Sequence, residues 1–294
     1  MMHAEVWSGM AEELTLMAVH AHPDDEAIST GGVLARYADE GLRTVLVTCT
    51  GGEVGEISDS MLATPETLAE VRRRELERAC EILRVARLHL LGYRDSGMMG
   101  TPDNEHPSSF YQASLEEATA RLVALVRRER PHVLVTYDER GFYGHPDHMR
   151  AHQITMVAFE TAGDPARWPE AGAPWRPAKL YHTAVARSAI KNFRRLMSEA
   201  GVEAPFGDGE AREPEIGIAD ELITTQIDVS AQVERKRQAL MAHATQMGPE
   251  VFFAKMPPAL FYRIFSRESF RLARGRSGAS GLENDLFAGL RGFP

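Results

Sequence analysis

The first half of the chain alternates apolar, β-branched runs with helical patterns, and this alternation constrains the fold more than any other feature. Helical spacing of apolar residues or helix-start signals predict helices near 33–38, 65–83, 115–128 and 146–161, with Thr64 as N-cap and Pro65 at the first helical position of the second. The strands are predicted at 14–20, 44–48, 87–91 and 132–137. We therefore predict an α/β fold with a doubly wound, mostly parallel, Rossmann-like sheet of strand order 3-2-1-4-5.

The pattern loosens beyond Gly163. Strands are predicted at 179–185 and 222–229, with helices near 189–199 and 231–245, and the last fifty residues give no clear pattern. We expect a Rossmann-like, metal-binding catalytic core over residues 1–185. A C-terminal elaboration over 186–294 is expected to pack on that core and to shape the substrate site.

Charge and composition exclude several classes of partner. The formal net charge is −9 and no long basic run compensates it, so a broad nucleic-acid footprint is not expected. No apolar run approaches the roughly 18–20 residues of a membrane span. Two cysteines rule out a disulfide framework, and the first 21 residues have no basic start of a secretory signal. We expect a cytoplasmic enzyme for small molecules, and a homo-oligomer stays open.

Two short segments share histidine and aspartate. Residues 21–26 (AHPDDE) follow the first predicted strand, and residues 144–148 (GHPDH) follow the fourth. In the predicted order these strands are neighbours, so both segments meet at the topological switch point where α/β sheets bind ligands. One such segment alone could be a turn with an Asx-type cap. Together, imidazoles and carboxylates suit catalytic zinc or ferrous iron, with a spare carboxylate as general base.

The two segments resemble the LmbE/PIG-L family of metal-dependent N-acetylglucosaminide deacetylases. The resemblance extends over most of the chain, through TCTGGEVGE (48–56), RDSGM (94–98), TYD (136–138) and AHATQ (242–246). These segments look like the branch that contains the mycothiol-pathway deacetylase and the mycothiol S-conjugate amidase.

The resemblance implies a role for each matching residue. The metal, Zn²⁺ with Fe²⁺ as an alternative in the same site, would be held by His22, Asp25 and His148. Asp24 matches the general base, His145 the residue that stabilises the oxyanion, and Asp147 the partner that orients it. Tyr143 matches a mobile tyrosine near the acyl group. Substrate contacts would come from Glu56, Arg72 and Asp95.

Several of these residues have a structural alternative. Arg72 lies in a run of three arginines that a helix could simply expose to water, and Asp95 could cap a turn. Glu56 ends a glycine-rich loop that does not form GxGxxG, which argues against a dinucleotide site. His152, one turn after His148, is expected to be structural, whereas His243 either lines the cleft or packs.

We predict a zinc-dependent hydrolase that cleaves the N-acyl amide of a glucosamine-containing substrate, most closely a mycothiol S-conjugate amidase. The alternative is an N-acetylglucosaminyl-inositol deacetylase, or a deacetylase of another N-acetylglucosamine conjugate in thiol biosynthesis or antibiotic tailoring. Two other classes use related residues: a ferrous, oxygen-dependent enzyme and a non-catalytic metal- or sugar-binding module. An intact Asp24 favours the hydrolase over both.

Overall fold

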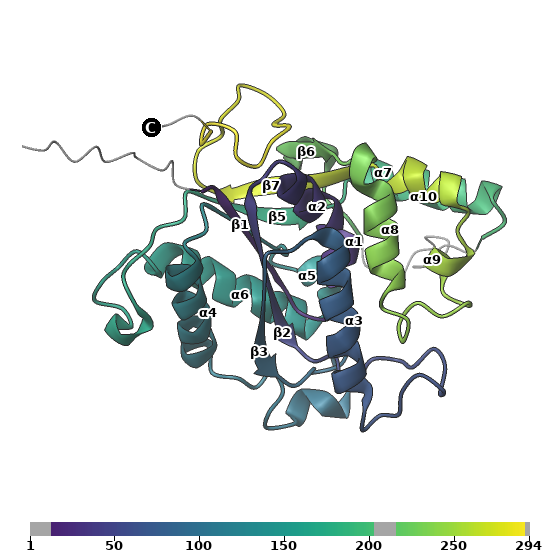
Figure 1. Cartoon of the computed structure of the whole chain (residues 1–294), viewed down its shortest axis with the longest axis horizontal. Helices are drawn as coiled ribbons and strands as arrows, with labels where there is room; N and C mark the ends of the chain where they lie inside the picture. Colours follow the sequence, from purple (N-terminus) through teal and green to yellow (C-terminus); the bar gives the residue numbers. More distant parts are fainter. Residues whose placement is uncertain (1–12, 203–215, 292–294) are drawn as a thin grey trace, which may run out of the picture.

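The computed structural model describes residues 13–202 and 216–291, and within them one mixed sheet has the strand order β3-β2-β1-β4-β5-β7-β6 (Figure 1). The first five strands run parallel, so the predicted order 3-2-1-4-5 is confirmed. The strands are β1 (Thr15–His20), β2 (Arg43–Thr50), β3 (Arg87–Tyr93), β4 (Val133–Thr136), β5 (Lys179–Ala184), β6 (Thr225–Asp228) and β7 (Arg267–Arg274).

The predicted helices are all present, two of their ends differ by more than two residues, and α1, α5, α9 and α10 were not predicted. They are α1 (Asp25–Ser29), α2 (Gly31–Asp39), α3 (Leu68–Leu83), α4 (Leu115–Glu129), α5 (Gly141–Gly144), α6 (Pro146–Thr161), α7 (Arg187–Glu199), α8 (Val233–Met241), α9 (Phe252–Lys255) and α10 (Pro258–Phe265). Short 3₁₀ turns occupy η1 (Pro102–Glu105), η2 (Pro169–Ala171), η3 (Asp220–Leu222) and η4 (Ser230–Gln232).

The predicted start of α3 at Pro65 was wrong. The Thr67 hydroxyl accepts the N–H of Thr64 at 2.9 Å, which closes a separate turn before the helix begins at Leu68. The predicted end of α8 near Thr245 was also wrong. Thr245 donates both its N–H and its hydroxyl to the Glu75 carboxylate, at 2.8 and 2.7 Å, and this contact draws the chain out of the helix.

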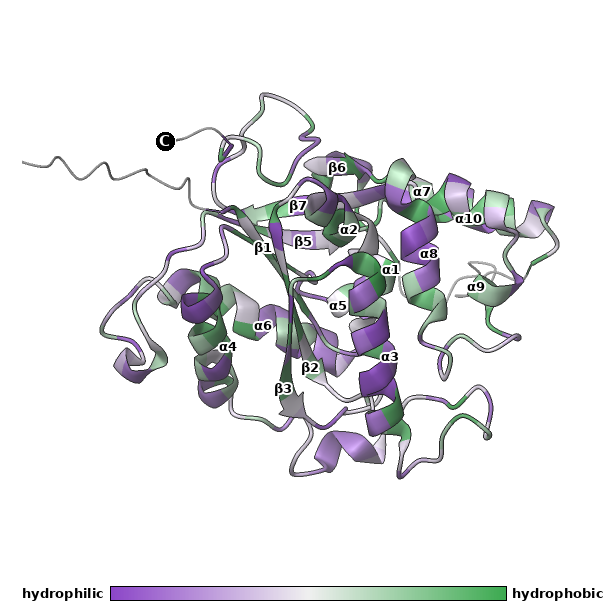
Figure 2. Ribbon diagram, in the orientation of Figure 1, coloured by the Kyte–Doolittle hydropathy of each residue, from purple (hydrophilic) through white to green (hydrophobic). Residues whose placement is uncertain are grey.

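Each face of the sheet carries its own hydrophobic core. Because strand residues alternate in direction, Met17 and Val19 face α4 and α6, whereas Leu16 and Ala18 face α2, α3 and α8. Figure 1 shows α4 and α6 on the opposite side of the sheet from α3 and α8, and Figure 2 shows apolar residues along the central strands. In the described ranges, no helix combines the length and the apolar character that crossing a bilayer requires.

The C-terminal part extends the same sheet. Strand β7 pairs antiparallel with both β5 and β6. No strand was predicted over residues 267–274. Its sequence, RESFRLAR, lacks an obvious apolar face because Glu268 points inward. The Glu268 carboxylate accepts the N–H groups of Gly32 and Val33 at the start of α2, at 2.7 and 2.8 Å, and pairs with buried Lys236 at 2.6 Å.

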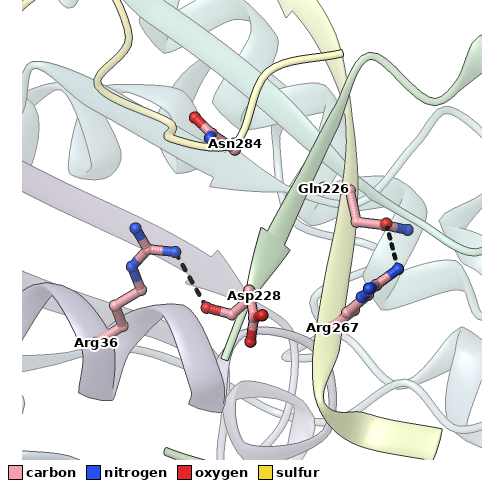
Figure 3. Close-up of a pocket in the computed structure, with 5 residues that line it drawn as sticks. All are labelled: Arg36, Gln226, Asp228, Arg267 and Asn284. Atoms are coloured by element: carbon pink, nitrogen blue, oxygen red, sulfur yellow. Dashed lines mark hydrogen bonds between the residues drawn. The ribbon is translucent and has the colours of Figure 1, made fainter. Parts of the chain in front are cut away.

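Polar side chains surround a surface hollow of about 400 Å³ beside the edge strand β6 (Figure 3). Arg36 donates to the Asp228 carbonyl at 3.0 Å, and Arg267 donates to the Gln226 amide oxygen at 3.3 Å. Charged side chains of this kind protect a sheet edge from pairing with another chain. None of the residues lining this hollow is a predicted site residue.

Candidate active site

The two histidine–aspartate segments meet at the carboxyl edge of the sheet. Strands β1 and β4 are hydrogen-bonded neighbours, and each is followed by one of the segments. Helix α6 begins at Pro146, which suits the first turn because it needs no backbone N–H partner. Asp147 and His148 therefore lie on the first turn of α6, next to His22.

Three donor atoms form a nearly equilateral triangle. His22 Nδ1 lies 3.3 Å from His148 Nε2 and 3.4 Å from Asp25 Oδ2, and the last two atoms are 3.5 Å apart. Ligands of a tetrahedral Zn²⁺ at about 2.0–2.1 Å are separated from one another by about 3.3–3.4 Å. All three side chains are buried, so the triangle has the size and the chemistry of a zinc site.

The second nitrogen of His22 faces carboxylates. Its Nε2 lies 3.2 Å from Asp147 Oδ2 and 3.5 Å from Asp95 Oδ1. Ser96 holds Asp147 in turn, with its N–H at 2.9 Å and its hydroxyl on the other oxygen. Burial lowers the pKa of His22, but the carboxylates of Asp147, Asp25 and Asp95 outweigh it and raise the pKa well above the usual value. Metal-binding histidines commonly have such a carboxylate on the far nitrogen.

Tyr137 contacts two of the proposed ligands and was not among the predicted site residues. Its hydroxyl donates to Asp25 Oδ2 at 2.7 Å and accepts the N–H of Ala21 at 2.9 Å. Its ring stacks on His148 with centroids 4.1 Å apart. Burial lowers the pKa of His148 to about 3, so this imidazole is neutral near pH 7, the form that binds metals.

Asp24 has an unusual backbone for a residue with a side chain. Its φ is +110°, a region that costs about 1–3 kcal/mol for such residues and that clusters at functional sites. Arg72 approaches it, with Nη2 at 3.3 Å from Asp24 Oδ2 and 2.5 Å from the Pro23 carbonyl. Burial raises the pKa of Asp24 to about 6, against the opposing charge of Arg72. A carboxylate with this pKa suits proton transfer near neutral pH.

His145 is the N-cap of α6, and its Nδ1 accepts the N–H of Asp147 at 3.2 Å. The proton of the neutral ring is therefore on Nε2, and burial lowers the pKa of His145 to about 4. Asp147 thus contacts His145 through its backbone, whereas its carboxylate contacts His22 and Ser96. The Tyr143 ring lies 5.1 Å from that of His148 and 6.2 Å from that of His145, and burial raises the pKa of Tyr143.

The three predicted substrate residues fall in different surroundings. Arg72 is buried, so its alternative as a solvated arginine was wrong. Asp95 caps a turn, as its structural alternative expects, since Oδ1 accepts the Gly97 N–H at 2.8 Å; the same oxygen lies 3.5 Å from His22 Nε2. The Glu56 side chain is exposed, whereas Glu53 in the same loop accepts the Asp95 N–H at 2.8 Å.

The two remaining histidines considered in the sequence lie away from the donor triangle. His152 Nδ1 lies 3.0 Å from the Tyr137 carbonyl, which fits its predicted structural role. His243 is fully buried, and its Nε2 lies 2.7 Å from Glu26 Oε1. It therefore contacts the AHPDDE segment rather than the open side of the site.

A family model described as PIG-L, GlcNAc-PI de-N-acetylase, matches residues 17–159. Proteins named 1D-myo-inositol 2-acetamido-2-deoxy-α-D-glucopyranoside deacetylase are similar over nearly the full length. The protein of that name (numbered 1) from Catenulispora acidiphila is 46% identical, over 94% of this chain and 89% of the relative. That from Geodermatophilus obscurus is 43% identical over 96% of this chain and 100% of the relative.

The chain belongs to the PIG-L family. The predicted resemblance is confirmed, and so is the prediction of an enzyme that hydrolyses an amide C–N bond. The names of the relatives support the deacetylase alternative better than the amidase that was placed first.

Solved structures agree in fold at low identity. The N,N′-diacetylchitobiose deacetylase of Pyrococcus horikoshii has a TM-score of 0.62 at 20% identity, over 89% of this chain and 84% of the other. The 4-carboxy-2-hydroxymuconate hydratase of Pseudomonas putida has a TM-score of 0.60 at 18% identity, over 90% and 97%. Since this PIG-L protein shares its fold with a deacetylase and with a hydratase, the fold does not by itself fix the reaction.

Proposed function

We propose that this PIG-L protein is a zinc-dependent deacetylase that removes the acetyl group from 1D-myo-inositol 2-acetamido-2-deoxy-α-D-glucopyranoside. The substrate assignment is supported by one observation: the chain is 43–46% identical to three deacetylases of that name, over at least 93% of its length. The product amine would be a glucosaminyl-inositol, a small and highly polar molecule.

Zinc is the metal that the donor set fits best. Two imidazole nitrogens and one carboxylate oxygen, about 3.4 Å apart, leave a fourth position open for water or substrate, which is the pattern of catalytic zinc. Fe²⁺ accepts the same ligands and remains the alternative. His22, Asp25 and His148 are the proposed ligands, and bound zinc would supply Lewis acidity and acidify a water molecule.

Asp24 is the proposed general base. Its carboxylate takes a proton from the water that attacks the acetyl carbonyl carbon, and it returns this proton to the sugar nitrogen as the C–N bond breaks. Acetate and the free amine are then the products. Arg72 Nη2 lies 3.3 Å from Asp24 Oδ2, and this contact limits how far the carboxylate can turn.

His145 is proposed to stabilise the negative charge that develops on the acetyl oxygen. The N–H of Asp147 occupies Nδ1, so the imidazole presents Nε2–H as a donor. Tyr143, whose raised pKa keeps its hydroxyl protonated, is proposed to act near the acyl group. The sugar and inositol hydroxyls are assigned to Asp95, Arg72 and Glu56; Asp95 contacts His22 of the donor triangle, and Arg72 contacts the proposed base Asp24.

The test is release of amine and acetate by the zinc-loaded protein from three substrates. We expect turnover of N-acetylglucosaminyl-inositol, much slower turnover of N-acetylglucosamine, and none of a mycothiol S-conjugate. Turnover of the S-conjugate alone would instead establish the amidase. Oxygen uptake during turnover would indicate a ferrous oxygenase, and binding without product would indicate a sugar-binding module.

The proposed cellular setting is the cytoplasm. Cys49 and Cys80 are both free and buried, and burial raises the pKa of both thiols, so they stay protonated and unreactive. Free cysteines are consistent with a reducing compartment. The proposed substrate is a small, uncharged sugar.

A further inference from the structure

Glu26 and His243 form a buried contact that the proposed reaction does not use. Glu26 is the last residue of the AHPDDE segment, and His243 lies two residues beyond α8 in the C-terminal part. Both side chains are fully buried, with His243 Nε2 2.7 Å from Glu26 Oε1. Nothing in the predicted ligand or base set requires either residue.

The second oxygen of Glu26 reaches the proposed base. Glu26 Oε2 accepts the backbone N–H of Asp24 at 3.0 Å. Asp24 is the residue whose φ is +110°, and a strained backbone of this kind persists only where surrounding contacts hold it. One carboxylate therefore connects the strained peptide to a histidine from a distant part of the chain.

His243 is itself held firmly. Its carbonyl accepts the N–H groups of Gln246 and Met247, both at 2.9 Å, which closes a turn around it. Two residues on, Thr245 is bound to Glu75 of α3 through two hydrogen bonds. The imidazole can therefore act as a fixed anchor for Glu26.

Stability alone is a poor explanation for such a pair. Removing two polar groups from water costs free energy, and replacing a buried charged pair by apolar residues of similar size is often neutral or stabilising. A buried pair is more readily explained by the one geometry it enforces. Here that geometry is the direction of the Asp24 side chain.

We propose that Glu26 and His243 are a positioning pair, through which the C-terminal part of the chain sets the orientation of Asp24 for proton transfer. The proposal rests on the assignment of Asp24 as the base. Neither residue touches substrate; His243 acts through Glu26, and Glu26 acts through the Asp24 peptide.

The test compares two variants of nearly equal shape. His243→Gln keeps an N–H that reaches about as far as Nε2, whereas His243→Met fills the same space without a donor. We expect the Met variant to lower kcat by about 10- to 100-fold with KM within twofold, since small misplacements of catalytic groups have effects of this size. The Gln variant should restore kcat to within about threefold of the parent protein.

A matched control is available in a second histidine–glutamate pair. His89 Nε2 lies 3.0 Å from Glu129 Oε1 on β3 and α4, away from the site. His89→Met should leave both constants unchanged. Bound zinc and thermal unfolding are measured for every variant, so that a loss of metal or of folded protein is separated from a loss of kcat.

Three outcomes overturn the proposal: parental kcat in a folded, zinc-loaded His243→Met, an equal loss in the Met and Gln variants, or a change confined to KM. If His243→Met does not fold, Glu26→Met, which removes the acceptor of the Asp24 N–H, replaces it, and parental kcat there also overturns the proposal. Asp24→Asn distinguishes a failure of the base assignment from a failure of the positioning pair. Full activity of Asp24→Asn removes the base assignment itself, whereas an inactive Asp24→Asn beside a fully active His243→Met removes only the positioning pair.

Discussion

The hydroxyl of Tyr137 contacts the proposed metal ligand Asp25, and Tyr137→Phe tests what this contact contributes. The hydroxyl makes three hydrogen-bond contacts: it donates to the carboxylate of Asp25 at 2.7 Å, accepts the N–H of Ala21 at 2.9 Å, and lies 3.3 Å from His20 Nδ1. The phenylalanine ring would keep the stacking on His148, because only one oxygen atom is removed. The substitution therefore isolates the hydrogen bonds of the hydroxyl.

The expected cost follows from the partners left behind. A hydrogen bond to a charged group contributes about 1.5–3 kcal/mol, and a buried N–H left without a partner costs about 1–3 kcal/mol. We expect Tyr137→Phe to lower the free energy of unfolding of the metal-free protein by about 3 kcal/mol. Zinc affinity should fall by about 10- to 100-fold, because Asp25 loses the group that orients it.

Urea unfolding of the metal-free protein and a competition titration with a zinc chelator measure these two quantities. Tyr93→Phe is the control, since Tyr93 also donates its hydroxyl to a carboxylate, at 2.5 Å from Glu117, but on β3 and away from the donor triangle. It should leave zinc affinity unchanged. The reasoning would be refuted by a Tyr137→Phe protein with parental zinc affinity and a loss of stability below about 1 kcal/mol.

Three further results are expected. Asp24→Asn should lower kcat by about 10²- to 10⁴-fold in steady-state assays with zinc content unchanged, as for loss of a general base, and retention of parental kcat would exclude that role. Because this base must be deprotonated and its pKa is raised to about 6, kcat/KM should rise with pH below about 6 and level off above it, and a profile flat down to pH 5 would contradict the assignment. Glu283→Gln should destabilise the fold by about 3–5 kcal/mol in urea unfolding, because it leaves Lys179 buried without its carboxylate. Burial opposes ionisation of Glu283, but Tyr181 and Lys179 lower its pKa below the unfolded value, so its contribution to stability is complete above the unfolded pKa and is lost as the pH falls through the folded pKa.

The central strands β1, β2 and β4 could be predicted because each is buried along almost its whole length and is an apolar, β-branched run in sequence. A strand buried on both faces carries no polar alternation, and the helices between such strands force parallel crossovers. Strand β7 was not predicted because its sequence is not an apolar run. Its inward-facing Glu268 is polar in sequence and finds its partners, Lys236 and the first turn of α2, only in the folded chain.

The site residues likewise divide into those that the sequence pattern indicates and those whose partners are found only in the folded chain. The proposed ligands His22, Asp25 and His148 lie in two short segments whose spacing already indicates metal chemistry. Tyr137 and Ser96 lie in the segments TYD and RDSGM that resemble the family, but their residue types indicate no metal chemistry, because a tyrosine or serine near a strand end has many ordinary roles. Their contacts to Asp25 and Asp147 depend on the relative position of separate loops, which the sequence pattern does not specify.

The C-terminal part shares its sheet and its site contacts with the predicted core, although the boundary near residue 185 stays a prediction. Strands β7 and β6 continue the central sheet, and residues beyond α8 supply the histidine that faces Glu26. The deacetylases at 43–46% identity match over at least 93% of the chain, so their similarity includes this part and not only the segment that binds metal. A sheet of this kind also serves a hydratase, so the fold fixes only where a site can form. What the chain does there depends on side chains that both parts bring to the carboxyl edge of the sheet.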